Sequence, residues 1–168
     1  MENPILYKSF DPEARFWLSN LGNYNEGPFK KKHPKLNLSA CDAYQQLMGE
    51  CFFFLESIDL CDKQVNGDKK VWKKSFSGRI AFTLGKLKTK NKQQSFEILN
   101  LPDLMSAKDA VYKLMKDVEG IEQPLGEITG KVKHEDYGFL SATEWYKLLV
   151  LTLKTNKHKI RAINKMFV

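Results

Sequence analysis

A long run of apolar residues at helical spacing, between residues 40 and 63, is the feature that most constrains the fold. The apolar side chains recur three and four residues apart, at Tyr44, Leu47, Met48, Cys51, Phe52, Leu55 and Ile58. That spacing places them along one side of an α-helix. Phe53 and Phe54 widen the apolar side, and so broad an apolar surface is usually covered by other elements on more than one face. We therefore predict that residues 40–63 form the longest, central helix.

Shorter helical patterns flank this central helix. They predict helices over residues 11–22, 106–120, 141–153 and 154–167. The last two could form one continuous helix. The clearest local signal is the capping box formed by Ser141 and Glu144, which marks a helix start. Residues 22–38 contain two prolines and two glycines, so we expect a loop there.

Alternating apolar and polar residues predict a small antiparallel sheet. The pattern indicates a β-hairpin over about 79–101 and a third strand over about 127–133. With 168 residues and 42% hydrophobic composition, the chain is long enough for one sizeable core. We therefore expect an α+β fold, with four or five helices around this sheet, in a single domain over residues 1–168.

The segment from residue 69 to residue 92 has nine basic side chains and no carboxylate. These are Lys69, Lys70, Lys73, Lys74, Arg79, Lys86, Lys88, Lys90 and Lys92. So many like charges repel one another unless a polyanion or an acidic neighbour balances them, and the segment itself contains no acid. Phosphate groups of a nucleic acid are the ligand that this composition predicts. The simpler alternative is a solvated lysine-rich hairpin that keeps an edge strand from aggregating.

Two further basic regions contribute to a net charge of +7. The loop of residues 22–38 carries Lys30, Lys31 and Lys32, and the expected C-terminal helix of residues 154–167 carries Lys157, Lys159 and Arg161. Because lysines far outnumber arginines in the three regions, we expect contacts to the phosphate backbone with little reading of base sequence.

Aromatic residues among the lysines favour a single-stranded ligand, DNA or RNA, because unpaired bases stack on flat side chains. Trp72 is the strongest candidate for stacking, since four lysines flank it, and the others are Phe76, Tyr24 and Phe29, although Phe76 is more simply interpreted as a core residue. An equally simple role for Trp72 is to cover the core where helix meets strand. The leading hypothesis is a non-enzymatic nucleic-acid-binding protein that works within a larger assembly. The alternative is a protein-interaction module, such as a ribonucleoprotein subunit or a small inhibitor, whose basic face docks on an acidic surface of another protein.

Signals for catalysis or for a cofactor are weak. The densest group of titratable residues is His134, Glu135 and Asp136, where a metal-dependent hydrolase site is conceivable, although short acidic turns are ordinarily solvated. No glycine-rich nucleotide-binding fingerprint is present, so we expect no cofactor and no enzyme activity.

The cysteines and the N-terminus bear on the compartment. Cys41, Cys51 and Cys61 are odd in number and form no C-x-x-C pair, so we expect reduced, largely packed thiols and no metal site. The chain has neither a signal-peptide pattern nor a run of about 20 apolar residues of the kind that spans a membrane. We expect a cytoplasmic protein, or a nuclear one in a eukaryote.

Overall fold

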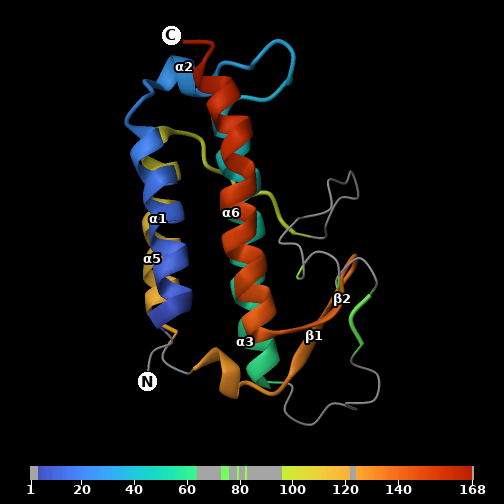
Figure 1. Ribbon diagram of the computed structural model, residues 1–168. Helices are drawn as coiled ribbons and strands as arrows, with labels where there is room; N and C mark the ends of the chain where they lie inside the picture. The colour runs from blue at the N-terminus through green and yellow to red at the C-terminus, as the bar shows by residue number, and fades with distance from the viewer. Residues whose placement is uncertain are drawn as a thin grey trace.

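The computed structural model describes residues 4–63, 73–75, 79, 82, 96–121 and 124–167 (Figure 1). Five α-helices, a short 3-10 helix and a two-stranded antiparallel sheet occur in the described part, which confirms the α+β class. The helices are α1 (Pro4–Leu21), α2 (Glu26–Lys30), α3 (Ala40–Lys63), α5 (Leu104–Glu119) and α6 (Ala142–Asn164), with the 3-10 helix η2 at Leu125–Glu127. The strands are β1 (Lys131–His134) and β2 (Gly138–Ser141).

The four long helices form a bundle. α1 packs against α5 and α6, and α3 packs against the same two helices. In Figure 1, α1 and α6 run upward, whereas α3 and α5 run downward. The upper end carries α2 and the C-terminus of α6, and the lower end carries the β1–β2 hairpin. We call these two ends of the bundle the α2 end and the hairpin end.

The central helix has the bounds that its apolar pattern predicts. Ser39 begins α3 with a reciprocal cap, because the Asp42 amide donates to Ser39 Oγ at 3.0 Å and the Ser39 amide donates to Asp42 Oδ2 at 2.9 Å. Tyr44, Cys51 and Phe54 along the same helix are fully buried. The prediction for residues 40–63 is therefore confirmed both in extent and in central position.

Aromatic side chains fill the core at two levels. Toward the α2 end, the Trp17 ring meets the Tyr44 ring edge-on, with centroids 5.2 Å apart. Trp17 Nε1 also donates a hydrogen bond of 3.0 Å to the Leu153 carbonyl, which links α1 to α6. Toward the hairpin end, the Trp145 ring lies 5.8 Å from that of Phe54. Both tryptophans are buried, so Trp17 fixes α1 to α3 and Trp145 fixes α6 to α3.

The first helix begins earlier than its sequence pattern indicates. We expected a start at Asp11, with Pro12 in the first turn, but α1 runs from Pro4 and holds Pro12 inside it. A proline inside a helix removes one backbone hydrogen bond. Burial of Phe10, Ala14 and Trp17 on one side of α1 offsets that loss. The expected loop of residues 22–38 likewise contains the short helix α2.

The expected hairpin over residues 79–101 is wrong wherever the structure describes it. Arg79 and Phe82 have helical backbone, and the Arg79 amide donates to the Ser75 carbonyl at 3.0 Å. Residues 96–101 have no regular secondary structure. They cross α3 at Gly49, where a Cβ atom would lie 2.4 Å from the Glu97 carbonyl oxygen. Phe96 packs against this part of α3, whereas Ile98 is exposed, so their alternation does not reflect pairing in a sheet.

The strand expected near residues 127–133 exists, with a different partner. It is β1, and β2 pairs with it after a tight turn in the register Val132↔Leu140 and His134↔Gly138. Gly138 has a φ angle of +76°, which an L-residue with a side chain rarely adopts. The two helices expected over residues 141–153 and 154–167 form the single helix α6, which starts with the predicted Ser141–Glu144 capping box.

Candidate nucleic-acid interface

Two of the three basic regions meet at the α2 end of the bundle. The loop after α2 and the last turns of α6 lie there together (Figure 1). Leu38 from the loop and Lys159 from α6 line one cavity, which confirms that the two segments are close. Six basic side chains in these segments are exposed, and none forms an ion pair with another described residue. We call this set the basic patch, and it consists of Lys31, Lys32, Lys35, Lys159, Arg161 and Lys165.

A buried polar network fixes the last turn of α6 to α1, to α3 and to the residues that precede α2. Tyr24 donates to Asn164 Oδ1, and Asn164 Nδ2 donates to Asn20 Oδ1 at 2.7 Å. Asn20 Nδ2 in turn donates to Tyr44 Oη at 3.1 Å, and Tyr44 donates to the Trp17 carbonyl at 2.6 Å. Burial raises the pKa of the Tyr44 hydroxyl, so it remains a donor. Four segments of the chain are thus joined by side-chain hydrogen bonds directly beneath the basic patch.

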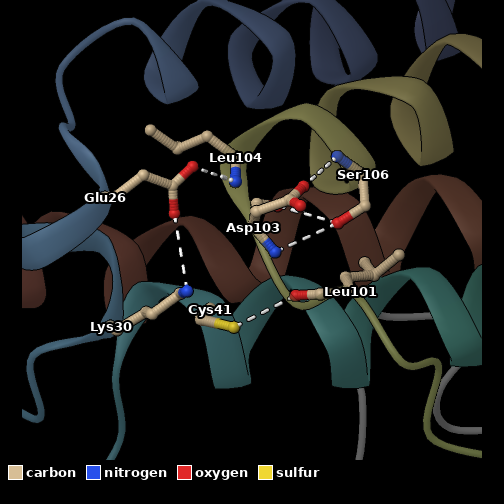
Figure 2. Close-up of polar contacts among 7 residues, drawn as sticks. All are labelled: Glu26, Lys30, Cys41, Leu101, Asp103, Leu104 and Ser106. Atoms are coloured by element: carbon tan, nitrogen blue, oxygen red, sulfur yellow. Dashed lines mark hydrogen bonds and ion pairs between the residues drawn. The ribbon is translucent and has the colours of Figure 1, made fainter.

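Carboxylates at the α2 end serve as helix caps (Figure 2). Asp103 begins α5 by accepting from the Ser106 amide at 2.7 Å, which lowers the pKa of its carboxyl group. Glu26, from α2, accepts a second bond of 2.9 Å from the Leu104 amide of the same helix start. Lys30 lies 3.7 Å from the other oxygen of Glu26. These acids balance the positive end of α5 and one lysine, and they do not neutralise the basic patch.

Lys157, predicted to bind nucleic acid, is engaged within the protein. Its Nζ lies 2.6 Å from Glu13 Oε2 on α1, and both side chains are mostly buried. The same ammonium group lies 4.6 Å from the centre of the Phe16 ring, over which Arg161 also packs at 5.3 Å. Lys157 therefore helps to join α1 to α6, and only the outer part of this helix face, with Arg161, is open to a ligand.

Lys73 and Lys74 lie at the hairpin end, away from the basic patch. The Phe139 amide donates to the Lys73 carbonyl at 3.1 Å, and the Ser75 amide donates to the Tyr137 carbonyl at 2.9 Å. These bonds place residues 73–75 beside β2, where Lys74 and Gly138 form an isolated antiparallel bridge. Lys74 forms an ion pair with Glu144, thirteen residues before Lys157 on α6, or about 20 Å along the helix.

The pair between Lys74 and Glu144 also explains the electrostatics of the capping box. Burial would raise the pKa of Glu144, but hydrogen bonds from Lys74 and from the Ser141 amide outweigh it and lower the pKa. Lys74 also lies 5.1 Å from the centre of the Phe82 ring. Its charge is therefore committed to the fold, whereas neighbouring Lys73 is exposed.

The predicted site residues thus fall into four groups. Lys31, Lys32, Lys159 and Arg161 lie at the α2 end, together with Lys30 in its pair with Glu26, whereas Lys73 and exposed Arg79 belong to the other basic segment. Lys74 and Lys157 hold internal ion pairs. The rest lie outside the described residues, namely Lys69, Lys70, Trp72, Phe76, Lys86, Lys88, Lys90 and Lys92.

Two of the aromatic residues proposed for base stacking are part of the core. Tyr24 is 7% exposed and Phe29 is 0% exposed, and their rings pack against each other with centroids 5.9 Å apart. The prediction that they stack on bases is therefore wrong. Sequence reasoning also missed that Glu26 and Asp103 cap α5, although the Asp103-x-x-Ser106 spacing is a recognisable capping signal.

A small cavity of about 60 Å³ lies beside the basic patch, between α3 and α6. Its polar lining comes from Gln46 and Glu50 on α3 and from Asn156 and Lys159 on α6. Burial raises the pKa of Glu50 to about 7, and the positive charge of Lys159 partly offsets this effect. Near neutral pH the Glu50 carboxyl is therefore only partly ionised, which leaves more of the Lys159 charge available to an external anion.

His134 is held as a neutral ring in the core of the hairpin. It is 2% exposed, and its Nδ1 accepts from the Asp136 amide at 3.1 Å and from the Tyr137 amide at 3.3 Å. Its ring stacks on that of Tyr137, with centroids 4.5 Å apart. Burial lowers the pKa of His134 to about 4, against the opposite influence of Asp136 and Glu135. These contacts organise the turn between the strands.

The described residues contain no group of three His, Cys, Asp or Glu side chains that could hold a metal ion. All three cysteines are free, with Cys51 and Cys61 buried, as expected of packed thiols. Within the described part of the chain, every helix is too short or too polar to cross a bilayer. Comparisons with protein families, with curated proteins and with solved structures give no match.

Proposed function

We propose that this protein binds nucleic acid through the phosphate backbone, with little discrimination of base sequence and without catalysing a reaction. The observation that carries the proposal is the state of the charges at the α2 end. Glu26 and Asp103 cap α5, Glu26 and Glu13 pair with Lys30 and Lys157, and burial leaves Glu50 only partly ionised near neutral pH, whereas the six cations of the basic patch form no ion pair with another described residue. Such a surface attracts a polyanion, and binding releases the counterions that the polyanion carries.

The binding mode follows from how firmly each basic segment is held in the fold. Lysines on α6 project from a helix that Trp17 and Asn164 fix to the rest of the bundle, so their spacing is set before a ligand arrives. Lys31, Lys32 and Lys35 extend the charge onto the adjoining loop. The lysine-rich segment of residues 69–92 adds further positive charge, and Lys73 and Arg79 are its described, exposed members.

A single-stranded ligand, DNA or RNA, is favoured in this proposal. Trp72 and Phe76 remain the candidates for stacking, since Tyr24 and Phe29 are buried. A protein of this kind would act in a cytoplasmic or nuclear compartment, where nucleic acid is present and free thiols stay reduced.

Fluorescence anisotropy with labelled single- and double-stranded DNA and RNA tests the proposal. Wild type should bind at low salt, and the logarithm of its affinity should fall linearly with the logarithm of the salt concentration. Each phosphate contact should steepen the slope of that line by about 0.7 for a single strand and by about 0.9 for a duplex. The variant K31E/K32E/K35E should lose about tenfold or more in affinity and should show a shallower salt dependence.

Two further variants locate the surface. K86E/K88E/K90E makes the same change of charge in the lysine-rich segment, so its loss relative to that of K31E/K32E/K35E ranks the two regions. K8E/K116E/K147E is the matched control, because these three lysines are exposed and lie outside both regions. Equal loss in all three variants would mean that only net charge matters, and absence of binding by wild type at low salt would reject the proposal.

A protein partner is the second candidate, and one observation favours it. Leu36 and Phe167 are 44% and 37% exposed at the α2 end, close in sequence to Lys35 and Lys165. Exposed apolar side chains among cations are typical of a surface that docks on another protein. Binding to one particular acidic protein, with no affinity for any of the four nucleic acids, would establish this alternative.

A further inference from the structure

An apolar groove lies at the hairpin end, where the C-terminal turns of α3 and α5 meet. The cavity measures about 310 Å³. Its apolar lining includes Leu55 and Ile58 from α3, together with Ile121 and Ile128 from the chain that follows α5. The C-terminal turns of α3 and α5 that line it lie at the hairpin end, opposite the α2 end that carries the basic patch (Figure 1).

Negative charge surrounds the groove. Asp59 and Asp62 line it from α3, and Asp117 lines it from α5. Both helices end here, so the negative ends of their dipoles add to the carboxylates. Asp59 pairs with Lys63 and Asp117 with Lys113 in exposed ion pairs, which add little stability and can exchange for lysines of a partner, and Asp62 forms no ion pair with another described residue. An occupant that brings both apolar and cationic side chains would therefore complement the groove.

The α2 end of the same chain offers that combination. Leu36 is 44% exposed next to Lys35, and Phe167 is 37% exposed two residues after Lys165. Apolar side chains flanked by lysines thus lie at one end of the bundle, and an apolar groove flanked by aspartates lies at the other. Charge and polarity are complementary between two different surfaces of one molecule.

We propose that the groove receives the α2 end of a second copy of this chain. The contact joins two different surfaces, so it is heterologous and leaves a free groove and a free basic patch at the two ends of every dimer. Copies then associate head to tail into short chains or closed rings. Because lysines approach aspartates across the contact, association weakens as salt rises. A nucleic acid on the basic patch competes with it.

Two charge-reversal variants test the contact, and each variant alters one of its two surfaces. D62K/D117K alters the groove and leaves the basic patch intact, whereas K32E/K35E alters the patch and leaves the groove intact. E97K/D109K is the matched control for the first variant, since both residues are exposed and lie outside the groove. Circular dichroism and thermal unfolding confirm that each variant is folded before association is measured.

Sedimentation velocity measures the association, at low and high salt and at concentrations up to about 0.5 mM, where small interfaces form. Wild type and E97K/D109K should show a mass that rises with concentration and falls with salt. Each of the other two variants should remain monomeric alone. Their equimolar mixture should associate again, because the intact patch of one variant meets the intact groove of the other, and the two reversed surfaces also carry opposite charges.

Monomeric wild type across the whole range would overturn the proposal, and so would a D62K/D117K variant that associates like wild type. A mixture of the two variants that stays monomeric would also overturn it. The test is independent of the proposed nucleic-acid binding. D62K/D117K should bind nucleic acid at least as well as wild type, since its basic patch is unchanged and competition from the groove is lost.

Discussion

The two ends of the bundle handle charge in opposite ways. At the α2 end, acids such as Glu26 and Asp103 are used as caps, and the lysines of the basic patch are exposed and form no ion pair with another described residue. At the hairpin end, Lys74 supports the capping box of α6 through Glu144, and Asp59, Asp62 and Asp117 line an apolar groove. A charged residue is therefore open to a ligand only where the fold does not use it, and amino-acid composition alone does not reveal which residues these are.

The largest expected effect concerns how the hairpin end is held together. Gly138→Ala should lower the free energy of unfolding by about 2 to 4 kcal/mol, because φ is +76° there and a Cβ atom would lie 2.5 Å from the Ser75 amide nitrogen. Gly126→Ala is the control, since no atom lies within 4 Å of a Cβ placed there. Urea unfolding of both variants measures the difference. Equal stability of the two would show that residues 73–75 are not part of the hairpin.

The next effect distinguishes the two ends by their response to pH. Burial lowers the pKa of His134 to about 4 from the ordinary 6.5, so the unfolded chain binds the proton more readily. Stability from this group is complete above pH 6.5 and is lost as pH falls toward 4, by an amount on the order of 2 kcal/mol. An NMR titration of the His134 ring should give a midpoint near 4, and a midpoint at or above 6 would contradict the buried neutral ring.

Glu50, beside the α2 end, should act in the opposite direction. Burial raises the pKa of Glu50 from 4.5 to about 7, so its contribution is present at low pH and is lost as pH rises through 7. Wild type therefore shows a flattened profile between pH 4.5 and 6.5, where the two groups oppose each other. Glu50→Gln should be more stable than wild type at pH 8 and should lose stability more steeply on acidification. Urea unfolding across this pH range measures both effects.

A smaller effect on stability distinguishes substitution of Lys74 from substitution of Lys73. Lys74→Met should destabilise the protein by about 1 kcal/mol, because it leaves the partly buried Glu144 carboxylate without its partner. Lys73→Met, at an exposed position, should change stability by less than about 0.5 kcal/mol. Thermal unfolding compares them. For nucleic-acid affinity we expect the reverse, with Lys73→Met losing more affinity than Lys74→Met. A greater loss of affinity in Lys74→Met would show that the Lys74–Glu144 ion pair opens on binding.

The smallest effect sharpens the comparison at the α2 end. Glu26→Gln keeps an acceptor for the Leu104 amide but removes the charge that pairs with Lys30. We expect a loss of about 0.5 kcal/mol in stability and a modest rise in nucleic-acid affinity, since one carboxylate leaves the edge of the basic patch. Glu56→Gln, at an exposed position on α3, is the control in the same anisotropy assay. Unchanged affinity would mean that Lys30 is not within reach of the ligand.

Local patterns predicted those parts of the fold whose stabilising contacts are local. The helix of residues 40–63 and the Ser141–Glu144 cap were both found because a dense apolar pattern and a short-range cap are visible in sequence. The start of α1 was missed because packing of Phe10 and Trp17 outweighs the interruption by Pro12. The pairing of β1 with β2 was missed because it depends on the left-handed backbone at Gly138.

The candidate site was predicted in part, for a similar reason. Exposed Lys31, Lys32, Lys159 and Arg161 could be named from the sequence, but not that they share one end of a bundle. The partners of Lys74 and Lys157 lie far away in the sequence, so local composition could not show that these two lysines are occupied.

The order in which the helices pack has a consequence for synthesis of the chain. α1 and α3 are made before α5 and α6, yet each packs mainly on these two later helices. The hydrogen bond from Trp17 to Leu153 cannot form until residue 153 has left the ribosome. The apolar sides of α1 and α3 are therefore without their partners until α6 emerges, and contact with a chaperone would protect them during that time. Truncation before α6 should leave a nascent chain that cannot close its core.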